Sequence, residues 1–327
     1  MLLKTARCIA SLVAVGAMAT GALAQSAYPD KPITLVVPYS AGGPTDTVAR
    51  VVGQAMSDEL GQQILVQNVG GAGGTLGSGQ VAAAAPDGYT LLIHHIGLAS
   101  APTMYPKLNF DPIADFAPIG LVTDAPMAVI ARKNLAANTM GELIAAIKAD
   151  GETMTLAHGG NGGAAHLCGM LLQEATGVQM VTVPYQGTAP AMTDILGGQV
   201  DLMCDQTTNT VSQIRNGDVK AYAVTSATRV ASLPDVPTTA EAGLPELTVG
   251  VWHGLYGPAG MDPQIVQTLD AALKKALANE TVIQRLADIG TTPAAQEEAT
   301  PDALKEKLAS QIDLWRPLIQ KAGVYAQ

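Results

Sequence analysis

Aromatic residues are scarce in this chain: phenylalanine, tryptophan and tyrosine make up 4% of its 327 residues. That scarcity argues against a cage of stacked rings for a sugar or a quaternary amine. Basic residues are outnumbered, 18 against 28 acidic ones, for a formal net charge of −10. Nucleic acid is therefore not an expected partner, because affinity for its phosphates comes mainly from lysine and arginine. An anionic ligand would have to be bound by local dipoles rather than by the net field.

Long apolar runs are also lacking, apart from Ile9–Met18 near the start of the chain. Basic residues precede that run and Ala22-Leu23-Ala24 follows it, which predicts a secretory signal peptide over residues 1–24. The alternative, a membrane anchor, is disfavoured because the run is too short to span a bilayer. Cleavage would leave 303 residues (327 minus 24) with a net charge of −12 (16 basic minus 28 acidic). We therefore expect a soluble, exported protein large enough for two α/β lobes.

Cysteine is rare, with three residues in the whole chain. Cys8 precedes the apolar run, so it is not placed as a lipid acceptor. Cys168 and Cys204 are the others. In an oxidising compartment they either form a disulfide or remain two buried free thiols, and the sequence leaves both alternatives open.

The five histidines lack the spacing of a metal site. No HxH or HxxxH pattern occurs among them, so we expect no metal. His94 and His95 are more suggestive, because they end an apolar strand and successive strand residues face opposite ways. We expect one imidazole to line a binding cleft and set ligand choice, with protonation near pH 6.5 strengthening anion binding. The alternative is a packed histidine bonded to a backbone carbonyl.

Short apolar strands alternate with helical patterns, which predicts parallel, doubly wound α/β sheets. The expected strands are Ile33–Val37, Gln63–Val66, Thr90–Ile93, Met127–Ala131, Met154–Ala157, Met180–Val183, Val200–Met203 and Ala221–Thr225. The expected helices begin near Thr45, Thr75, Met140, Ala165, Ala189 and Val211, and two more cover Pro263–Leu277 and Pro301–Ala322.

Three glycine-rich elbows, Ser40–Gly43, Gly70–Gly74 and Gly159–Gly163, each join a strand to a helix. Backbone N–H groups and the positive end of a helix dipole at such an elbow suit a carboxylate or phosphate. The alternative is that glycine only shortens these connections.

Two short motifs are typical of enzymes. Gly160, Gly162 and Ala165 match the GxGxxA dinucleotide fingerprint, but no acid follows the next strand to hold a ribose, so we expect no cofactor. Pro38-Tyr39-Ser40-Ala41-Gly42 is similar to the nucleophile elbow of hydrolases. An exported serine hydrolase using Ser40 is the alternative function, although no histidine or acid is placed to activate that serine.

Four stretches together resemble the Bug-type periplasmic receptors of tripartite tricarboxylate transporters. They are YPDKPITLVVPYSAGGPTDTVAR, APDGYTLLI, VPYQGTAPAMTDILGGQVDLMCD and AVTSATRVASLPDVPTTAEAGLP. The resemblance runs from about Tyr28 to Val324. It implies a two-lobed type II periplasmic binding protein, with each lobe a doubly wound sheet flanked by helices. Residues 25–124 and 247–327 would form lobe 1 and residues 125–246 lobe 2.

The resemblance also implies a monomeric, non-enzymatic receptor. It would bind a small di- or tricarboxylate, aromatic acid or amino acid and deliver it to the membrane components of the transporter. The candidate ligand-binding residues are Tyr39, Ser40, Ala41, Gly42, Asp46, His94, His95, Gly160, Asn161, Gly162, Gly163, Ala164 and Asp205. Gly163 and His94-His95 depart from the family pattern. Asp205 is expected to select a donor group on the ligand. Hinge closure is expected near Leu121–Met127 and Leu244–Gly254.

Overall fold

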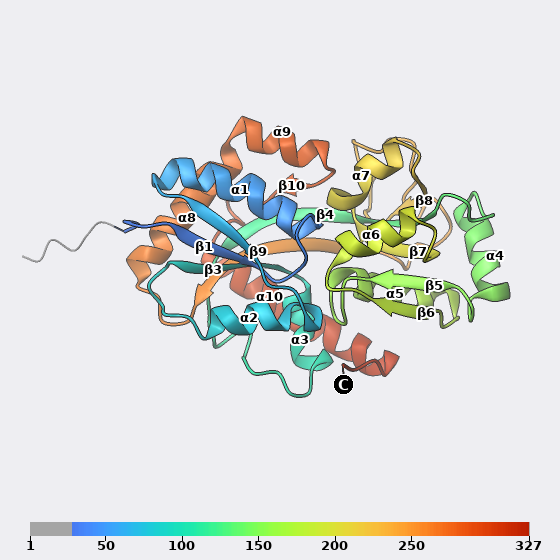
Figure 1. Cartoon of the computed structure of the whole chain (residues 1–327), viewed down its shortest axis with the longest axis horizontal. Coiled ribbons are helices and arrows are strands. Elements are labelled where there is room, and N and C mark those ends of the chain that lie inside the picture. The colour runs from blue at the N-terminus through green and yellow to red at the C-terminus, as the bar shows by residue number, and fades with distance from the viewer. Residues whose placement is uncertain (1–27, 327) are drawn as a thin grey trace, which may run out of the picture.

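A single long strand, β4 (Phe116–Arg132), runs through both halves of the molecule (Figure 1). The structure is a computed structural model that describes residues 28–326; the expected signal peptide, residues 1–24, lies outside them. Within residues 28–326, no helix combines the length and the apolar character needed to cross a bilayer. The first part of β4 pairs with β9 in one lobe, and its second part, from Met127, pairs with β7 and β8 in the other.

Two sets of strands share β4. Lobe 1 contains β1 (Ile33–Val37), β2 (Ile64–Asn68), β3 (Thr90–His95), β9 (Gly250–Pro258) and β10 (Thr292–Pro293). Lobe 2 contains β5 (Thr155–His158), β6 (Val181–Pro184), β7 (Leu202–Gln206) and β8 (Val219–Val224). The main strand order is β2-β1-β3-β9-β4-β7-β5-β6, with β8 and β10 also paired to β4.

The helices lie between and around these strands. They are α1 (Pro44–Leu60), α2 (Thr75–Ala82), α3 (Gly97–Met104), α4 (Met140–Asp150), α5 (Ala164–Thr176), α6 (Thr188–Leu196), α7 (Thr207–Arg215), α8 (Pro263–Ala278), α9 (Glu280–Asp288) and α10 (Pro301–Ala322). A single 3₁₀ turn, Ala72–Gly74, precedes α2.

Strand β1 shows why helices cover both faces of lobe 1. Four of its five residues, in the sequence ITLVV, are apolar and buried, as expected of a strand covered on both sides; Thr34 is half-buried. Leu35 packs in the cluster that includes α1, α8 and α9. The next residue, Val36, packs in the opposite cluster, which includes α3 and α10. Figure 1 shows these two helical layers above and below the strands.

The prediction of a two-lobed α/β fold is confirmed, with one correction. The strands were expected to be parallel, but β4 and β9 run antiparallel to their neighbours, so the sheets are mixed. The reason is that the chain crosses between the lobes along these two strands, in opposite directions. Of the two expected crossings, Leu121–Met127 lies within β4, and the last residues of Leu244–Gly254 begin β9.

Candidate functional site

The first and third glycine-rich elbows meet at a small buried cavity between the lobes, with a volume of about 20 Å³. That is room for about one water molecule. Lobe 1 contributes Tyr39, Gly43, Pro44, Thr45 and His95, and lobe 2 contributes Gly159, Gly163, Ala164, Ala165, Thr188, Asp205 and Gln206. The lining therefore includes the first residues of α1, α5 and α6.

Helices α1 and α5 both begin at the cavity with an uncapped turn. Gly43 and Gly163 are their N-caps, both extended and both without a side chain to accept a hydrogen bond. Within the described chain, the N–H groups of Thr45, Ala164 and Ala165 have no hydrogen-bond partner. Unpaired N–H groups and the positive ends of two helix dipoles make this cavity suited to a carboxylate.

The glycine elbows contribute less than the sequence suggested, because most of their N–H groups are already bonded. Gly42 N–H donates to the Asp46 carboxylate over 2.9 Å. Gly160 N–H donates to His158 Nδ1 and Gly162 N–H to His166 Nδ1, over 3.3 and 3.0 Å. The free donors are thus in the helices, one or two residues beyond the elbows.

Eight of the expected site residues lie outside the cavity lining: Ser40, Ala41, Gly42, Asp46, His94, Gly160, Asn161 and Gly162. Ala41 and Gly42 are exposed on the turn. The expected residues that do line the cavity are Tyr39, His95, Gly163, Ala164 and Asp205.

Asp46 supports the first elbow instead of facing the cavity. Its carboxylate accepts hydrogen bonds from Arg50 Nε and Asn68 Nδ2 as well as from Gly42 N–H. Burial alone would raise the pKa of Asp46, but the bonds from Arg50, Gly42 and Asn68 outweigh it and lower that pKa. Asp46 is therefore a charged brace that fixes the turn before α1.

His95 faces the cavity and His94 does not, but the expected protonation near pH 6.5 is wrong. Burial lowers the pKa of His95 well below 6.5, and the nearby His94 and His253 lower it further. Burial likewise lowers the pKa of His94 to about 3. Both rings are neutral at neutral pH, because a buried imidazolium without a counter-ion is unfavourable.

Asp205 is the acidic group of the cavity. It is buried, and Asn209 Nδ2 donates to its Oδ2 over 2.6 Å. Burial raises the pKa of Asp205 to about 6, although hydrogen bonds from Asn209, Gln206 and Thr188 oppose the rise. A carboxylate opposite two helix N-termini binds a hydrogen-bond donor more readily than a second carboxylate.

Ser40 lacks the partners of a nucleophile. Its hydroxyl is buried without a hydrogen-bond partner among residues 28–326, so neither a histidine nor an acid activates it there. The same part of the chain holds no group of three or more His, Cys, Asp or Glu side chains that could bind a metal ion.

The lobes touch at the edge of the cavity through several hydrogen bonds. Ser40 N–H donates to the Gln186 carbonyl over 3.0 Å, and the hydroxyl of Tyr105 to the Asn161 carbonyl over 2.9 Å. On the α3 side, Ser100 Oγ donates to the Gly162 carbonyl over 2.7 Å. These contacts join residues of opposite lobes, so the structure represents a closed state.

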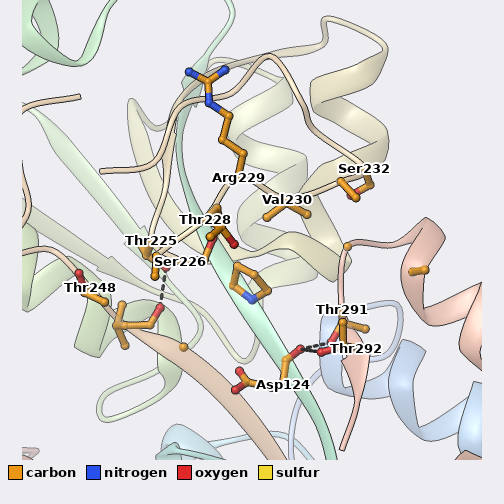
Figure 2. A pocket seen from close by; sticks show the side chains of 17 residues that line it. Asp124, Thr225, Ser226, Thr228, Arg229, Val230, Ser232, Thr248, Thr291 and Thr292 are labelled. Atoms are coloured by element: carbon orange, nitrogen blue, oxygen red, sulfur yellow. Dashed lines mark hydrogen bonds between the residues drawn. The ribbon is translucent and has the colours of Figure 1, made fainter. Parts of the chain in front are cut away.

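A larger cavity of about 460 Å³ lies where the chain crosses between the lobes (Figure 2). Figure 2 shows Asp124 beside Thr291 and Thr292, with Arg229 on the opposite side of the cavity. Its polar side chains are largely bonded within the protein: Thr225 and Thr291 hydroxyls donate to backbone carbonyls. None of its lining residues belongs to the first turn of a helix, so the smaller cavity is the better candidate for an anion site.

Seven residues that line this smaller cavity are not among the expected ligand-binding residues, although two of them belong to the first and third elbows: Gly43, Pro44, Thr45, Gly159, Ala165, Thr188 and Gln206. The signal for Thr45 and Ala165 was present, because each occupies the first turn of a helix that follows a glycine elbow. Thr188 and Gln206 come from the starts of α6 and α7, which no local pattern links to the elbows.

Comparisons with known proteins agree with this fold. Residues 48–324 match the tripartite tricarboxylate transporter family receptor. A protein from Agrobacterium vitis, described as the UPF0065 protein in the TAR-I ttuE-ttuC′ intergenic region, is 48% identical over 97% of this chain and 92% of its own.

Two solved structures are similar across most of their length. The periplasmic binding protein BugD superimposes with a TM-score of 0.89 at 48% identity, covering 92% of this chain and 100% of that one. MatC from Rhodopseudomonas palustris, solved with bound malate, superimposes with a TM-score of 0.87 at 40% identity, covering 89% of this chain and 100% of that one.

Proposed function

The chain belongs to the tripartite tricarboxylate transporter receptor family, and on that premise we propose that it binds a small carboxylate between its lobes in the periplasm. It would then deliver the ligand to the membrane components of such a transporter. The observation that carries the proposal is the pair of uncapped helix N-termini, α1 and α5, at one buried cavity. The malate bound to MatC supports the carboxylate class.

The cavity suggests how the ligand is held. The carboxylate of the ligand accepts hydrogen bonds from the N–H groups of Thr45, Ala164 and Ala165. The side chain of Asp205 accepts a hydrogen bond from a hydroxyl or ammonium group of the ligand. A hydroxy or amino acid of a few carbons fits this pattern better than a simple fatty acid.

We propose lobe boundaries at residues 25–124 and 247–327 for lobe 1 and 125–246 for lobe 2. The pairing of β4 supports them, since it changes partners between Pro126 and Met127. The family consists of solute-binding receptors, and the unpartnered hydroxyl of Ser40 gives the hydrolase alternative no support.

The test removes one backbone donor. Ala164→Pro deletes the N–H of the first residue of α5, a position where proline is favoured, and Gly163 already has the extended conformation that a following proline requires. The variant should bind malate about 10- to 100-fold more weakly by calorimetry, as expected for a hydrogen bond to a charged group. Native mass spectrometry of freshly purified protein would identify the physiological ligand.

The matched control is Glu280→Pro, at the first residue of α9, where the side chain is exposed and far from the cavity lining. It should bind malate as the wild type does. If the wild type binds no member of a panel of hydroxy, amino and dicarboxylic acids, or hydrolyses an ester using Ser40, the proposed receptor function is wrong.

A further inference from the structure

His95 is held in one orientation by contacts on several sides. Its ring stacks on Tyr39 with centroids 4.6 Å apart and planes inclined by 21°. The Tyr39 hydroxyl is in turn fixed by donation to the Gly73 carbonyl over 2.9 Å. His94 and His253 approach His95 edge-on, with centroids 5.1 and 6.0 Å away. The imidazole therefore has little freedom to rotate.

The ring nitrogens of His95 have different partners. Nδ1 accepts the N–H of Gly97, the first residue of α3, over 2.9 Å. An amide N–H can only donate, so Nδ1 carries no proton and the proton of the neutral ring lies on Nε2. Among residues 28–326, no group accepts a hydrogen bond from His95 Nε2.

We propose that His95 presents a fixed, uncharged Nε2–H donor to the cavity and thereby selects ligands with a second acceptor group, such as the distal carboxylate of a dicarboxylate. The proposal rests on the proposed receptor function and specifies its ligand further. It follows from two facts: His95 lines the cavity, and its other nitrogen is occupied by the protein itself. The protein supplies no acceptor for this donor, so a ligand that pairs with it gains a hydrogen bond that other ligands lack.

Burial and the two neighbouring histidines keep the imidazole of His95 uncharged. His94, His253 and Tyr39 pack against the ring, and the acidic Asp205 belongs to the same cavity lining. Burial and the two histidines lower the pKa of His95 well below 6.5, in agreement with the unprotonated Nδ1. The donor is therefore present without uptake of a proton, unlike a titrating histidine.

Two substitutions distinguish the role of Nδ1 from that of Nε2 in His95. His95→Asn places an amide oxygen near Nδ1 to accept from Gly97 but lacks the donor at Nε2, whereas His95→Gln can place an N–H near Nε2. With malate and succinate as probes, His95→Asn should bind about 10- to 100-fold more weakly, and His95→Gln should recover most of that loss. Butyrate, which lacks the second carboxylate, should show little difference among the three proteins.

His158→Asn is the matched control. His158 ends β5 as His95 ends β3, and its Nδ1 accepts the N–H of the glycine two residues later, but it does not line the cavity. The His158→Asn variant should bind malate with the same affinity as the wild type. Equal affinities of His95→Asn and wild type, or equal losses in His95→Asn and His95→Gln, would overturn the proposal.

A second readout needs no ligand. Nitrogen-15 NMR of the imidazoles should show His95 as the Nε2–H tautomer between about pH 5.5 and about pH 8. A Nδ1–H tautomer, or titration of the ring within that range, would contradict the inference. Failure of the wild type to bind any carboxylate would instead overturn the proposed function, and the tautomer would still be decided.

Discussion

Asp205 places a negative charge where two helix N-termini create a site for anions. Its buried carboxyl has a pKa raised to about 6, which is above the ordinary value of 3.8. A carboxyl whose pKa is higher in the folded than in the unfolded state takes up protons on folding. Its contribution to stability is therefore most favourable below the unfolded pKa, and it is lost as the pH rises through the folded pKa. Asp205 should thus cost stability at neutral pH.

Replacing Asp205 by Asn should reveal that cost. The free energy of unfolding of Asp205→Asn, relative to wild type, should rise by about 2 kcal/mol between about pH 4 and about pH 7.5, because the pKa difference of Asp205 no longer contributes. Urea unfolding at both pH values measures this difference. The same variant should bind hydroxy and amino acids more weakly at neutral pH, since it loses the carboxylate that accepts their donor group.

Asp201→Asn serves as a control of opposite sign. Burial would raise the pKa of Asp201, but hydrogen bonds from Thr155 and Arg132 outweigh burial and lower that pKa. Asp201 therefore stabilises the fold above its unfolded pKa, and this stabilisation is lost as the pH falls through its folded pKa. This variant should lose stability relative to wild type at neutral pH and lose less in acid. Parallel pH responses of the two variants would show that burial of Asp205 has no such effect.

At the scale of single elements, a disulfide joins α5 to β7. The structure contains a bond between Cys168 and Cys204, whose Cα atoms are 5.9 Å apart and which are separated by 36 positions in sequence. It lies just behind the start of α5 and one residue before Asp205, so it ties together two parts of the cavity lining.

Removing this bond by Cys168→Ala with Cys204→Ala should lower the free energy of unfolding by about 3–4 kcal/mol in the chain-entropy model. Denaturant unfolding measures the loss. Thiol titration of the denatured, unreduced wild type should detect no free thiol from this pair. Two reactive thiols in protein isolated from the periplasm would show that the cysteines are unpaired there.

Glycine at position 73 is required by lobe closure. Its φ is +61°, and a Cβ there would overlap the carbonyl oxygen of Asn161 in the opposite lobe. Gly73→Ala should therefore hinder closure and weaken malate binding, by about tenfold or more if closure is displaced by an ångström. Affinity by calorimetry measures the effect.

The control for Gly73→Ala is Gly61→Ala. Gly61 has a similar φ of +65° at the C-terminal end of α1, but a Cβ there would meet nothing within 4 Å. It should lose similar backbone stability and keep its affinity for malate. If both variants bind equally well, the contact between Gly73 and Asn161 does not limit closure.

Most elements could be predicted from the sequence where the spacing of apolar residues agreed with the glycine and proline residues that end or begin an element. β1 and α10 begin and end where the sequence predicts, because β1 is a β-branched run and α10 starts with Thr300-Pro301 and ends before Gly323. By contrast, β9 contains three glycines, and α3 contains Pro102, so their local patterns indicate loops. Both are stabilised by burial between neighbouring elements, which no local pattern reveals.

The site was predicted less completely than the fold. The recognisable composition of glycine-rich turns after strands identified the elbows, whereas Tyr39, Gly163 and Ala164 were implied by the family resemblance. It did not indicate that His158 and His166 would occupy the elbow N–H groups, since that depends on side-chain orientation in the folded lobe. For the same reason, the neutral state of His95 follows only from its burial.

At the scale of the whole molecule, closure should be a hinge motion about the two crossing strands. Small-angle scattering should show a smaller radius of gyration with saturating malate than without it, because ligand binding favours the closed state. An unchanged radius at saturation, together with a second structure in which the lobes keep their present relation, would refute the hinge.

The shared strand β4 also has a consequence for how the chain folds. β9 lies between β3 and β4, so the sheet of lobe 1 cannot be completed until residues after 250 are available. The strands of lobe 2, β4 to β8, are contiguous in sequence and need no later segment. Because contacts between segments far apart in sequence form slowly, lobe 2 should acquire protected amides before lobe 1, whose early strands join β4 only through the distant β9. Pulsed hydrogen exchange during refolding would reveal that order. The chain should be most prone to aggregation while β1 and β3 have formed but β9 has not yet paired with β3.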